Sequence, residues 1–140
     1  MKSDFKEDNL TRQIIGAFYT VYNTLGYGFL EKVYERALAI ELRKKGLSVY
    51  CQQAITVYYQ GEVVGEYLAD MVVNGLVILE LKAAEAIHVN HEAQLFNYLK
   101  ATEIEIGLLL NFVPKPDFSR KVFSNERKKH RVQPSKADLI

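Results

Sequence analysis

The chain has 140 residues, of which 49% are hydrophobic and 25% charged, and its formal net charge is +1. This length and composition are typical of one globular domain and leave no room for a second domain of ordinary size. The small net charge excludes a broad basic surface, so any contact with nucleic acid needs positive charge gathered in one place.

The sequence carries no signal for secretion or membrane insertion. Its N-terminus mixes acids with lysines and lacks the apolar run of a signal peptide. No stretch approaches the roughly 20 apolar residues that span a bilayer. The single cysteine, Cys51, cannot form an internal disulfide, which fits a reducing compartment. We therefore expect a soluble, cytoplasmic protein with no membrane partner.

Two amphipathic helices open the chain. Apolar residues at helical spacing predict the first helix over residues 8–25 and the second over residues 29–45. Gly26-Tyr27-Gly28 ends the first helix, because glycine takes left-handed conformations without steric cost, and Gly46 ends the second.

Strand patterns follow, and one helix interrupts them. The expected elements are three strands, a helix and a strand, over residues 49–59, 63–73, 76–82, 89–101 and 104–112. Asn74-Gly75 between two apolar runs is a strong hairpin signal. The unbroken apolar run of the last strand is typical of burial on both faces. This order predicts an α/β or α+β sheet with an antiparallel meander, one crossover helix and further helices packed on it.

Basic residues predominate from about residue 115 to residue 136. Two alternatives stay open for this segment: a solvated terminus, or an arm that contacts phosphate groups. We accordingly divide the chain into a domain over residues 1–125 and a basic C-terminal tail over residues 126–140.

Three charged residues stand within apolar strand sequences. Glu80 and Lys82 are two positions apart and therefore share one face of their strand. Asp70 lies in the preceding strand, between Ala69 and Met71. Charge in such surroundings is costly unless it is paired or bound to a metal, so these residues need an explanation.

The register of the hairpin decides whether the two carboxylates meet. A two-residue turn would pair Asp70 with Leu79 and point Glu80 to the opposite face. A three-residue loop, Val73-Asn74-Gly75, would pair Val72 with Leu76 and place both carboxylates on one face. We expect this bulged loop, or an equivalent irregularity near Asp70.

Two converging carboxylates beside a lysine suit phosphodiester hydrolysis. Carboxylate oxygens hold Mg²⁺ or Mn²⁺, which binds few protein groups and keeps several waters. The metal lowers the pKa of a bound water and neutralises phosphate charge, while the lysine orients that water or stabilises developing charge. A buried ion pair between acid and lysine is the alternative, because a bare E-x-K tripeptide is common by chance.

Two further pairs of residues share helix faces. Glu31 opens the second helix three residues before Tyr34, and Gln94 and Tyr98 are four residues apart on the helix after the E-x-K strand. Each has a structural alternative: Glu31 as an acid favoured by the helix dipole, Gln94 as a surface residue, and Tyr98 as a core aromatic.

The segment from Gly28 to Tyr34, GFLEKVY, resembles the signature of the GxxExxY proteins, a family placed in the PD-(D/E)xK nuclease superfamily. Further stretches similar to that family are YLAD at 67–70, ELK at 80–82, QLFNYL at 94–99 and GLLLNF at 107–112. The similarity covers roughly residues 8–125. It implies an α/β fold with a restriction-endonuclease-like αβββαβ core, whose central mixed sheet is flanked by helices.

The resemblance also implies a metal site. In that superfamily the residues corresponding to Asp70 and Glu80 bind the metal, and the one corresponding to Lys82 assists the attacking water. Glu31 corresponds to a further metal or water ligand. Leu81, inside the E-x-K tripeptide, is counted with the metal-binding residues.

Gln94 and Tyr98 correspond to a Q-x-x-x-Y pair of RecB-like members, and the resemblance implies that they support the site or bind the substrate backbone. The chain departs from the superfamily pattern at one position. The proline that gives the superfamily its name is replaced by Ala69, before Asp70, and this removes no ligand.

The sequence therefore predicts a Mg²⁺- or Mn²⁺-dependent deoxyribonuclease that cuts by in-line attack of a metal-activated water. The alternative is a non-catalytic nucleic-acid-binding or protein-interaction module that retains the fold, and the intact set of Asp70, Glu80 and Lys82 argues against it. RNA as the substrate stays open. A homodimer stays open as well, since small nucleases that act on both strands are often symmetric dimers.

Overall fold

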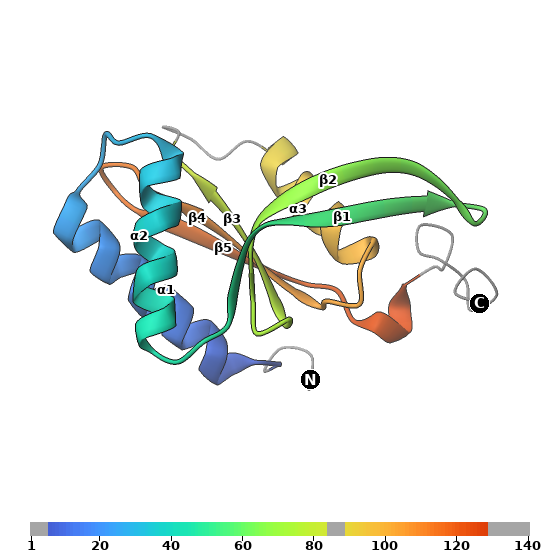
Figure 1. Ribbon diagram of the computed structural model, residues 1–140, viewed down its shortest axis with the longest axis horizontal. Helices are drawn as coiled ribbons and strands as arrows, with labels where there is room; N and C mark the ends of the chain where they lie inside the picture. Colours follow the sequence, from blue (N-terminus) through green and yellow to red (C-terminus); the bar gives the residue numbers. More distant parts are fainter. Residues whose placement is uncertain (1–5, 84–88, 129–140) are drawn as a thin grey trace.

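A mixed sheet of five strands lies between two helices on one face and one helix on the other (Figure 1). The computed structural model describes residues 6–83 and 89–128. In chain order the elements are α1 (Asp8–Leu25), α2 (Glu31–Lys44), β1 (Val49–Tyr59), β2 (Glu62–Val73), β3 (Val77–Lys82), α3 (Val89–Lys100), β4 (Ile106–Asn111), β5 (Asp117–Val122) and a short 3-10 helix (Asn125–Arg127). Except for β5 and the 3-10 helix, each begins and ends within two residues of its predicted bounds.

The strands lie in the sheet in chain order, from β1 to β5. β1, β2 and β3 form an antiparallel meander. β4 pairs parallel to β3 because α3 carries the chain back across the sheet, and β5 returns antiparallel to β4. These pairings confirm the predicted α/β fold with a mixed sheet flanked by helices.

Apolar side chains fill the space on both sides of the sheet. On one face, Phe18 of α1 and Tyr34 of α2 are the largest side chains that these helices bury. On the opposite face, Leu95 and Leu99 of α3 are fully buried. Every residue of β4 is buried, as its unbroken apolar sequence predicts. At Gly107 of β4 an added Cβ would come within 2.7 Å of Leu95 Cδ1, so glycine permits the close approach of α3.

The β1–β2 hairpin is longer than the sheet it belongs to. β2 pairs with β3 only through residues 71–73. The remainder, residues 53–59 and 62–69, forms a two-stranded arm that bends over α3 (Figure 1). Ala69 packs on the α3 side of the sheet, whereas Met71, two positions later, packs on the α1 and α2 side. In a regular strand these two residues would share a face, so β2 switches faces at Asp70.

The basic C-terminal segment joins the domain as far as the structure describes it. Residues 117–122 form β5, and Lys128 is 6% exposed, with its Nζ donating to the carbonyl oxygens of Thr102 and Ile104 at 2.8 Å each. Of the two alternatives left open for this segment, a wholly solvated terminus does not fit residues 117–128, because they form an edge strand, which tolerates charged side chains, and end in a buried lysine. Residues 129–140, the rest of the predicted tail, lie outside the described residues.

Over the described ranges, no helix is both long enough and apolar enough to cross a membrane.

Candidate active site

The loop between β2 and β3 sets which residues of the two strands share a face. Val73 pairs with Val77, so the loop consists of residues 74–76. The predicted pairing of Val72 with Leu76 is wrong, because the loop begins one residue later than expected. The observed loop also has three residues, however, so the two carboxylate positions fall on the same face, as the register argument required.

A contact from outside the hairpin explains where the loop begins. The Asn74 amide N–H donates to the Ser48 carbonyl oxygen at 2.8 Å, and Asn74 Oδ1 accepts the Ser48 N–H at 2.8 Å. This pair of hydrogen bonds fixes Asn74 in the left-handed conformation (φ 54°), and Gly75 follows with φ 65°. Both residue types tolerate positive φ.

Asp70 and Glu80, hereafter the carboxylate pair, lie opposite each other where the β2–β3 ladder ends. The last backbone pairing is Met71 with Leu79. Beyond it, Asp70 N–H donates to Glu80 Oε2 at 2.8 Å, and Leu81 N–H donates to Asp70 Oδ2 at 2.7 Å. Each carboxylate thus accepts the hydrogen bond that a backbone carbonyl would accept in a regular ladder. The backbone of each strand therefore fixes the acidic side chain of the other.

The neighbouring strand β1 is irregular at the same level. Cys51 pairs with Met71 and Gln53 with Ala69, but Gln52 between them adopts the left-handed conformation with φ 56°. A left-handed glutamine is strained and needs support from its surroundings. The irregularity that the sequence predicted near the aspartate is therefore present, in β1 and β2 together.

Burial raises the pKa values of both carboxyl groups. Glu80 is 5% exposed, and its burial, followed by the charge of Asp70, raises its pKa from 4.5 to about 7. Burial also raises the pKa of Asp70, although the Leu81 N–H and the charge of Lys82 oppose the rise. The raised pKa values mean that the charged forms of these acids are unfavourable in the folded protein. A bound cation would stabilise those charged forms.

Two acids of α2 also act on the carboxylate pair. Burial is the main cause of the raised pKa of Asp70, and the negative charges of Glu35 and Glu31 add to it. Glu31 is exposed at the start of α2. Glu35 is 7% exposed, accepts a hydrogen bond from Gln52 Nε2 at 2.9 Å and forms an ion pair with Lys32 at 3.3 Å. Sequence reasoning missed Glu35, although it lies four residues after Glu31 and so shares its helix face.

Tyr34 shapes the loop that precedes α2. Its side chain is fully buried, its hydroxyl donates to the Gly26 carbonyl oxygen at 2.7 Å, and its ring stacks on Phe112 with centroids 4.1 Å apart. Gly28 in this loop has φ 107°, a conformation that side chains rarely adopt. The glycine and the tyrosine of the Gly28–Tyr34 signature therefore build the loop that leads to Glu31.

Gln94 and Tyr98 interact on α3, as their helical spacing predicts. Gln94 Nε2 donates to Tyr98 Oη at 2.8 Å. Tyr98 is 4% exposed, and burial, followed by the negative charge of Glu80, raises its pKa to about 12. The hydroxyl of Tyr98 therefore stays protonated at neutral pH.

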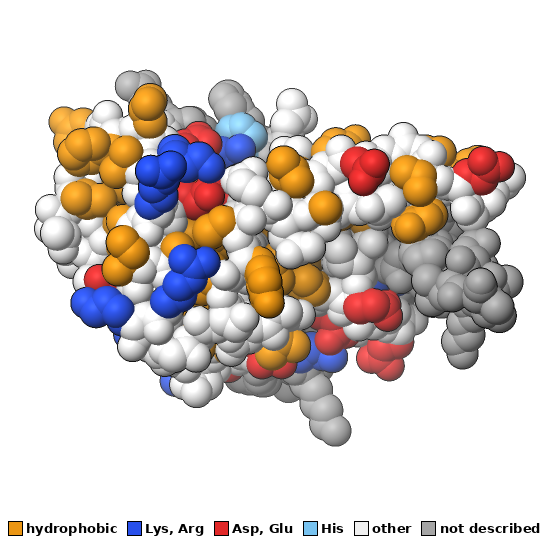
Figure 2. All heavy atoms as spheres, viewed as in Figure 1, with side chains coloured by type: hydrophobic (Ala, Val, Ile, Leu, Met, Phe, Trp, Pro, Cys, Tyr) orange, Lys and Arg blue, Asp and Glu red, His pale blue; other side chains and the backbone are white. Residues whose placement is uncertain are grey.

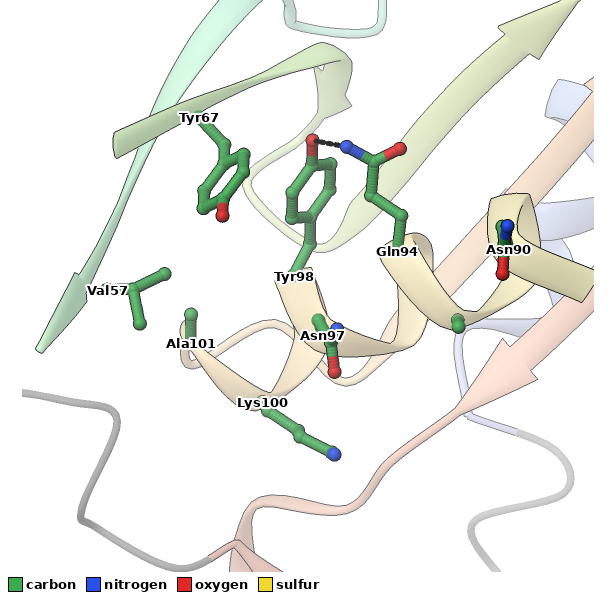
Figure 3. A pocket seen from close by; sticks show the side chains of 9 residues that line it. Val57, Tyr67, Asn90, Gln94, Asn97, Tyr98, Lys100 and Ala101 are labelled. Atoms are coloured by element: carbon green, nitrogen blue, oxygen red, sulfur yellow. Dashed lines mark hydrogen bonds between the residues drawn. The ribbon is translucent and has the colours of Figure 1, made fainter. Parts of the chain in front are cut away.

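A pocket of about 430 Å³ lies between the arm and α3 (Figure 3). Val57 and Tyr67 line it from the arm, and Gln94, Asn97 and Tyr98 line it from α3. Sequence reasoning did not predict this pocket, because the pocket depends on the bend that carries the arm over α3.

The carboxylate pair offers the ligands that Mg²⁺ requires. Within residues 6–83 and 89–128, no group of three or more His, Cys, Asp or Glu side chains is arranged to hold a metal, so Glu31 is not placed as a third protein ligand. Mg²⁺ is nevertheless commonly bound through only one or two carboxylates, with water completing its coordination. Leu81 N–H is already bonded to Asp70, which leaves only the carbonyl oxygen of Leu81 to offer.

Acidic and basic side chains lie side by side near the N-terminal end of α2 (Figure 2). The charged residues in the first part of this helix include Glu31, Lys32 and Arg36, all of them exposed. Glu31 and Glu35 accompany these two bases, and Lys32 forms an ion pair with Glu35, so the start of α2 is mixed in charge rather than a basic patch.

Three comparisons with known proteins bear on this site. A sequence model of the PD-(D/E)XK nuclease superfamily matches residues 8–122, from the start of α1 to the end of β5. The crystal structure of SSO0001 is similar over 88% of this chain, with a TM-score of 0.54 and 18% sequence identity, and the match covers 63% of that protein's chain. At this identity the likeness shows the fold alone. No curated protein matches the sequence.

Proposed function

Since the chain belongs to the PD-(D/E)XK nuclease superfamily, we propose that it is a Mg²⁺- or Mn²⁺-dependent nuclease that hydrolyses phosphodiester bonds of DNA. The observation that carries this proposal is the carboxylate pair: Asp70 and Glu80 lie on one face where two strands separate, Glu80 is buried, and repulsion by the charge of Asp70 helps to raise the pKa of Glu80. A divalent cation would relieve this repulsion, which otherwise opposes folding.

The hydrogen bonds of the pair indicate which oxygens would bind the cation. Asp70 Oδ2 and Glu80 Oε2 each accept a backbone N–H, so both side chains are oriented before any ligand arrives. The second oxygens, Asp70 Oδ1 and Glu80 Oε1, are the natural ligands. We assign the Leu81 carbonyl oxygen as a further ligand and Glu31 as a contact through water, because it lies exposed at the start of α2.

The bound cation would lower the pKa of a water and neutralise charge on the phosphate. Lys82 shares the strand face of Glu80, and its charge lowers the pKa values of both acids. From that position its ammonium group would orient the attacking water or stabilise charge on the phosphate oxygens. Gln94 and Tyr98 form a bonded pair on α3, which would support the carboxylates or contact the substrate backbone.

Asp70→Asn and Glu80→Gln test the proposal without dismantling the site. Each amide keeps an oxygen that can accept the backbone N–H now held by the carboxylate, while it removes the charge that attracts the cation. We expect either change to reduce metal-dependent DNA cleavage by at least 100-fold and to weaken Mn²⁺ binding measured by calorimetry. Lys82→Ala is expected to reduce cleavage while it leaves Mn²⁺ binding largely intact.

Glu66→Gln is the matched control, because Glu66 is an exposed acid on the arm. It should cleave as the wild type does. Single-stranded, duplex and flapped DNA and a matched RNA are the substrates to compare. Mn²⁺ binding without cleavage of any of them would favour the non-catalytic alternative, and no binding at millimolar Mn²⁺ would refute the metal site.

Membership of the GxxExxY family stays a prediction.

A further inference from the structure

The pocket between the arm and α3 combines an apolar interior with a polar rim. Val57, Ala101 and the rings of Tyr67 and Tyr98 provide its apolar surface. Its volume, about 430 Å³, falls within the range of small-molecule sites in proteins. Figure 3 shows the two tyrosine rings side by side above Ala101, with Val57 at the left below Tyr67.

Tyr67 offers an aromatic surface that is held in place. Its ring centroid lies 5.9 Å from that of Tyr98, and a Cβ at Gly65 would come within 3.3 Å of the Tyr67 ring. Although neighbours confine it in this way, the residue is 48% exposed. A positioned aromatic ring with open surface is the platform on which proteins stack the bases of single-stranded nucleic acids.

The rim on the α3 side carries side-chain amides. Asn90, Gln94 and Asn97 line the pocket and are exposed. Each amide carries both a donor and an acceptor, which the edges of nucleobases also present. Lys100 at the same rim adds positive charge suited to a phosphate.

We propose that this pocket takes one unpaired base of single-stranded DNA, beside the phosphate that the carboxylate pair receives. The inference rests on the proposed nuclease function, because Tyr98 connects the two sites. Tyr98 lines the pocket and belongs to the same buried cluster as Ala69, the residue directly before Asp70. A strand whose base stacks on Tyr67 would therefore pass its backbone along α3 toward the carboxylates.

The pocket makes the nuclease selective for DNA structure. In a duplex both faces of a base are stacked and its pairing edge is occupied, so the base reaches a pocket only after it is flipped out at an energetic cost. An unpaired base avoids that cost. Single-stranded, flapped or gapped DNA is therefore the expected substrate class, with duplex DNA bound more weakly.

The test measures binding by fluorescence anisotropy in EDTA, where metal-dependent cleavage cannot occur. The probes are a labelled thymidine hexamer and an abasic hexamer of the same charge, together with a 12-base-pair duplex and a uridine RNA hexamer. The proteins are the wild type, Tyr67→Ser, Tyr67→Phe and Tyr59→Ser. Tyr59 is the control because it lies on the same arm and is 54% exposed, but does not line the pocket.

We expect the wild type to bind the thymidine hexamer at least tenfold more tightly than the abasic hexamer. Tyr67→Ser should remove most of this difference and leave the abasic affinity unchanged, whereas Tyr67→Phe and Tyr59→Ser should retain it. Equal affinity of the wild type for both hexamers would overturn the proposal, as would an equal loss on both in Tyr67→Ser. Tighter binding of the RNA hexamer would overturn DNA as the occupant.

The same proteins separate this inference from the proposed function. Base-dependent binding that requires Tyr67, without Mn²⁺-dependent cleavage of any substrate, would support the pocket and contradict the nuclease. Cleavage that Asp70→Asn abolishes but Tyr67→Ser leaves unchanged, together with base-independent binding, would support the nuclease and contradict the pocket. Equal melting temperatures of Tyr67→Ser and the wild type show that the variant is folded.

Discussion

At the scale of single residues, Glu80 is held in a place that its charge disfavours. The rise of its pKa from 4.5 to about 7 corresponds to about 3 kcal/mol of destabilisation of the charged form. Both the folded and the unfolded protein carry this charge at pH 8, and only the folded protein keeps it buried. We therefore expect Glu80→Gln to stabilise the protein at pH 8 in EDTA, by about 1–3 kcal/mol in urea unfolding.

Addition of Mg²⁺ should reverse this order. The cation binds the folded wild type and raises its free energy of unfolding by linkage, whereas Glu80→Gln has lost a ligand and gains little. Glu66→Gln, which removes an exposed charge, should leave stability within about 0.5 kcal/mol of the wild type under both conditions. A Glu80→Gln protein less stable than the wild type in EDTA would contradict the raised pKa of Glu80.

How far residues could be predicted depended on whether their positions follow from local geometry. Glu80 and Lys82 could be placed on one face because strand alternation is local, and Asp70 followed from the parity of the loop. Glu35 could not be recognised, because an acid in a helix is usually exposed. Its burial depends on Gln52, a residue of another element, whose side chain reaches it.

At the scale of elements, Gly107 sets how closely α3 approaches β4. An added Cβ would lie 2.7 Å from Leu95 Cδ1 and 2.9 Å from Leu95 Cγ, so the leucine or the helix must move. Overpacking of a filled core typically costs about 1–3 kcal/mol. We expect Gly107→Ala to lower the free energy of unfolding by that amount, measured by urea denaturation.

Gly16→Ala is the matched control for this change. Gly16 lies within α1, is exposed, and has no atom within 4 Å of an added Cβ. Alanine is favoured over glycine in a helix interior by roughly 0.5–1 kcal/mol, so this variant should be more stable than the wild type. Opposite signs for the two substitutions are therefore expected. A Gly107→Ala protein as stable as the wild type would show that α3 shifts at no cost.

Elements were predictable where their apolar pattern is strong, and not where their partners define them. Helical spacing gave the bounds of α1 and strand alternation gave those of β1, and an unbroken apolar run predicted β4 to within two residues at each end. β5 escaped prediction because its sequence, DFSRKV, is rich in charge and forms a strand only by pairing with β4 at the edge of the sheet. The bend of the arm also escaped prediction, since the left-handed Gln52 and the change of face at Asp70 become visible only in the paired strands β1 and β2.

At the scale of the whole molecule, the two ends of the described chain meet at Glu105. Its carboxylate accepts two hydrogen bonds, one from Lys6 Nζ at 3.1 Å and one from the Asn125 N–H at 2.7 Å. Arg120 of β5 also donates to the Lys6 carbonyl oxygen at 2.8 Å. The 3-10 helix Asn125–Arg127 spans the predicted boundary between residues 125 and 126, and Lys128 beyond it bonds to the carbonyl oxygens of Thr102 and Ile104. The domain division, the homodimer and the cytoplasmic location stay predictions.

Lys128 also holds the C-terminal segment on the domain, and its titration should make the free energy of unfolding depend on pH. Burial lowers its pKa from 10.5 to about 8, against the opposing charges of Glu103 and Glu105. Below pH 8 the folded and unfolded states are both protonated, so the cost of burying the charge is present in full. Between pH 8 and 10.5 the folded protein loses the proton while the unfolded chain keeps it, so the Lys128 contribution to stability rises with pH.

Lys128→Met tests this response, because methionine keeps an unbranched apolar stem and cannot titrate. The free energy of unfolding of the wild type relative to this variant should increase between pH 8 and 10.5, by at most about 3 kcal/mol, in urea denaturation at each pH. Lys115→Met, which removes an exposed lysine, should leave the free energy of unfolding within about 0.5 kcal/mol of the wild type. If the Lys128→Met difference does not change with pH, Lys128 is solvated, and the C-terminal segment does not close over Thr102 and Ile104 in solution.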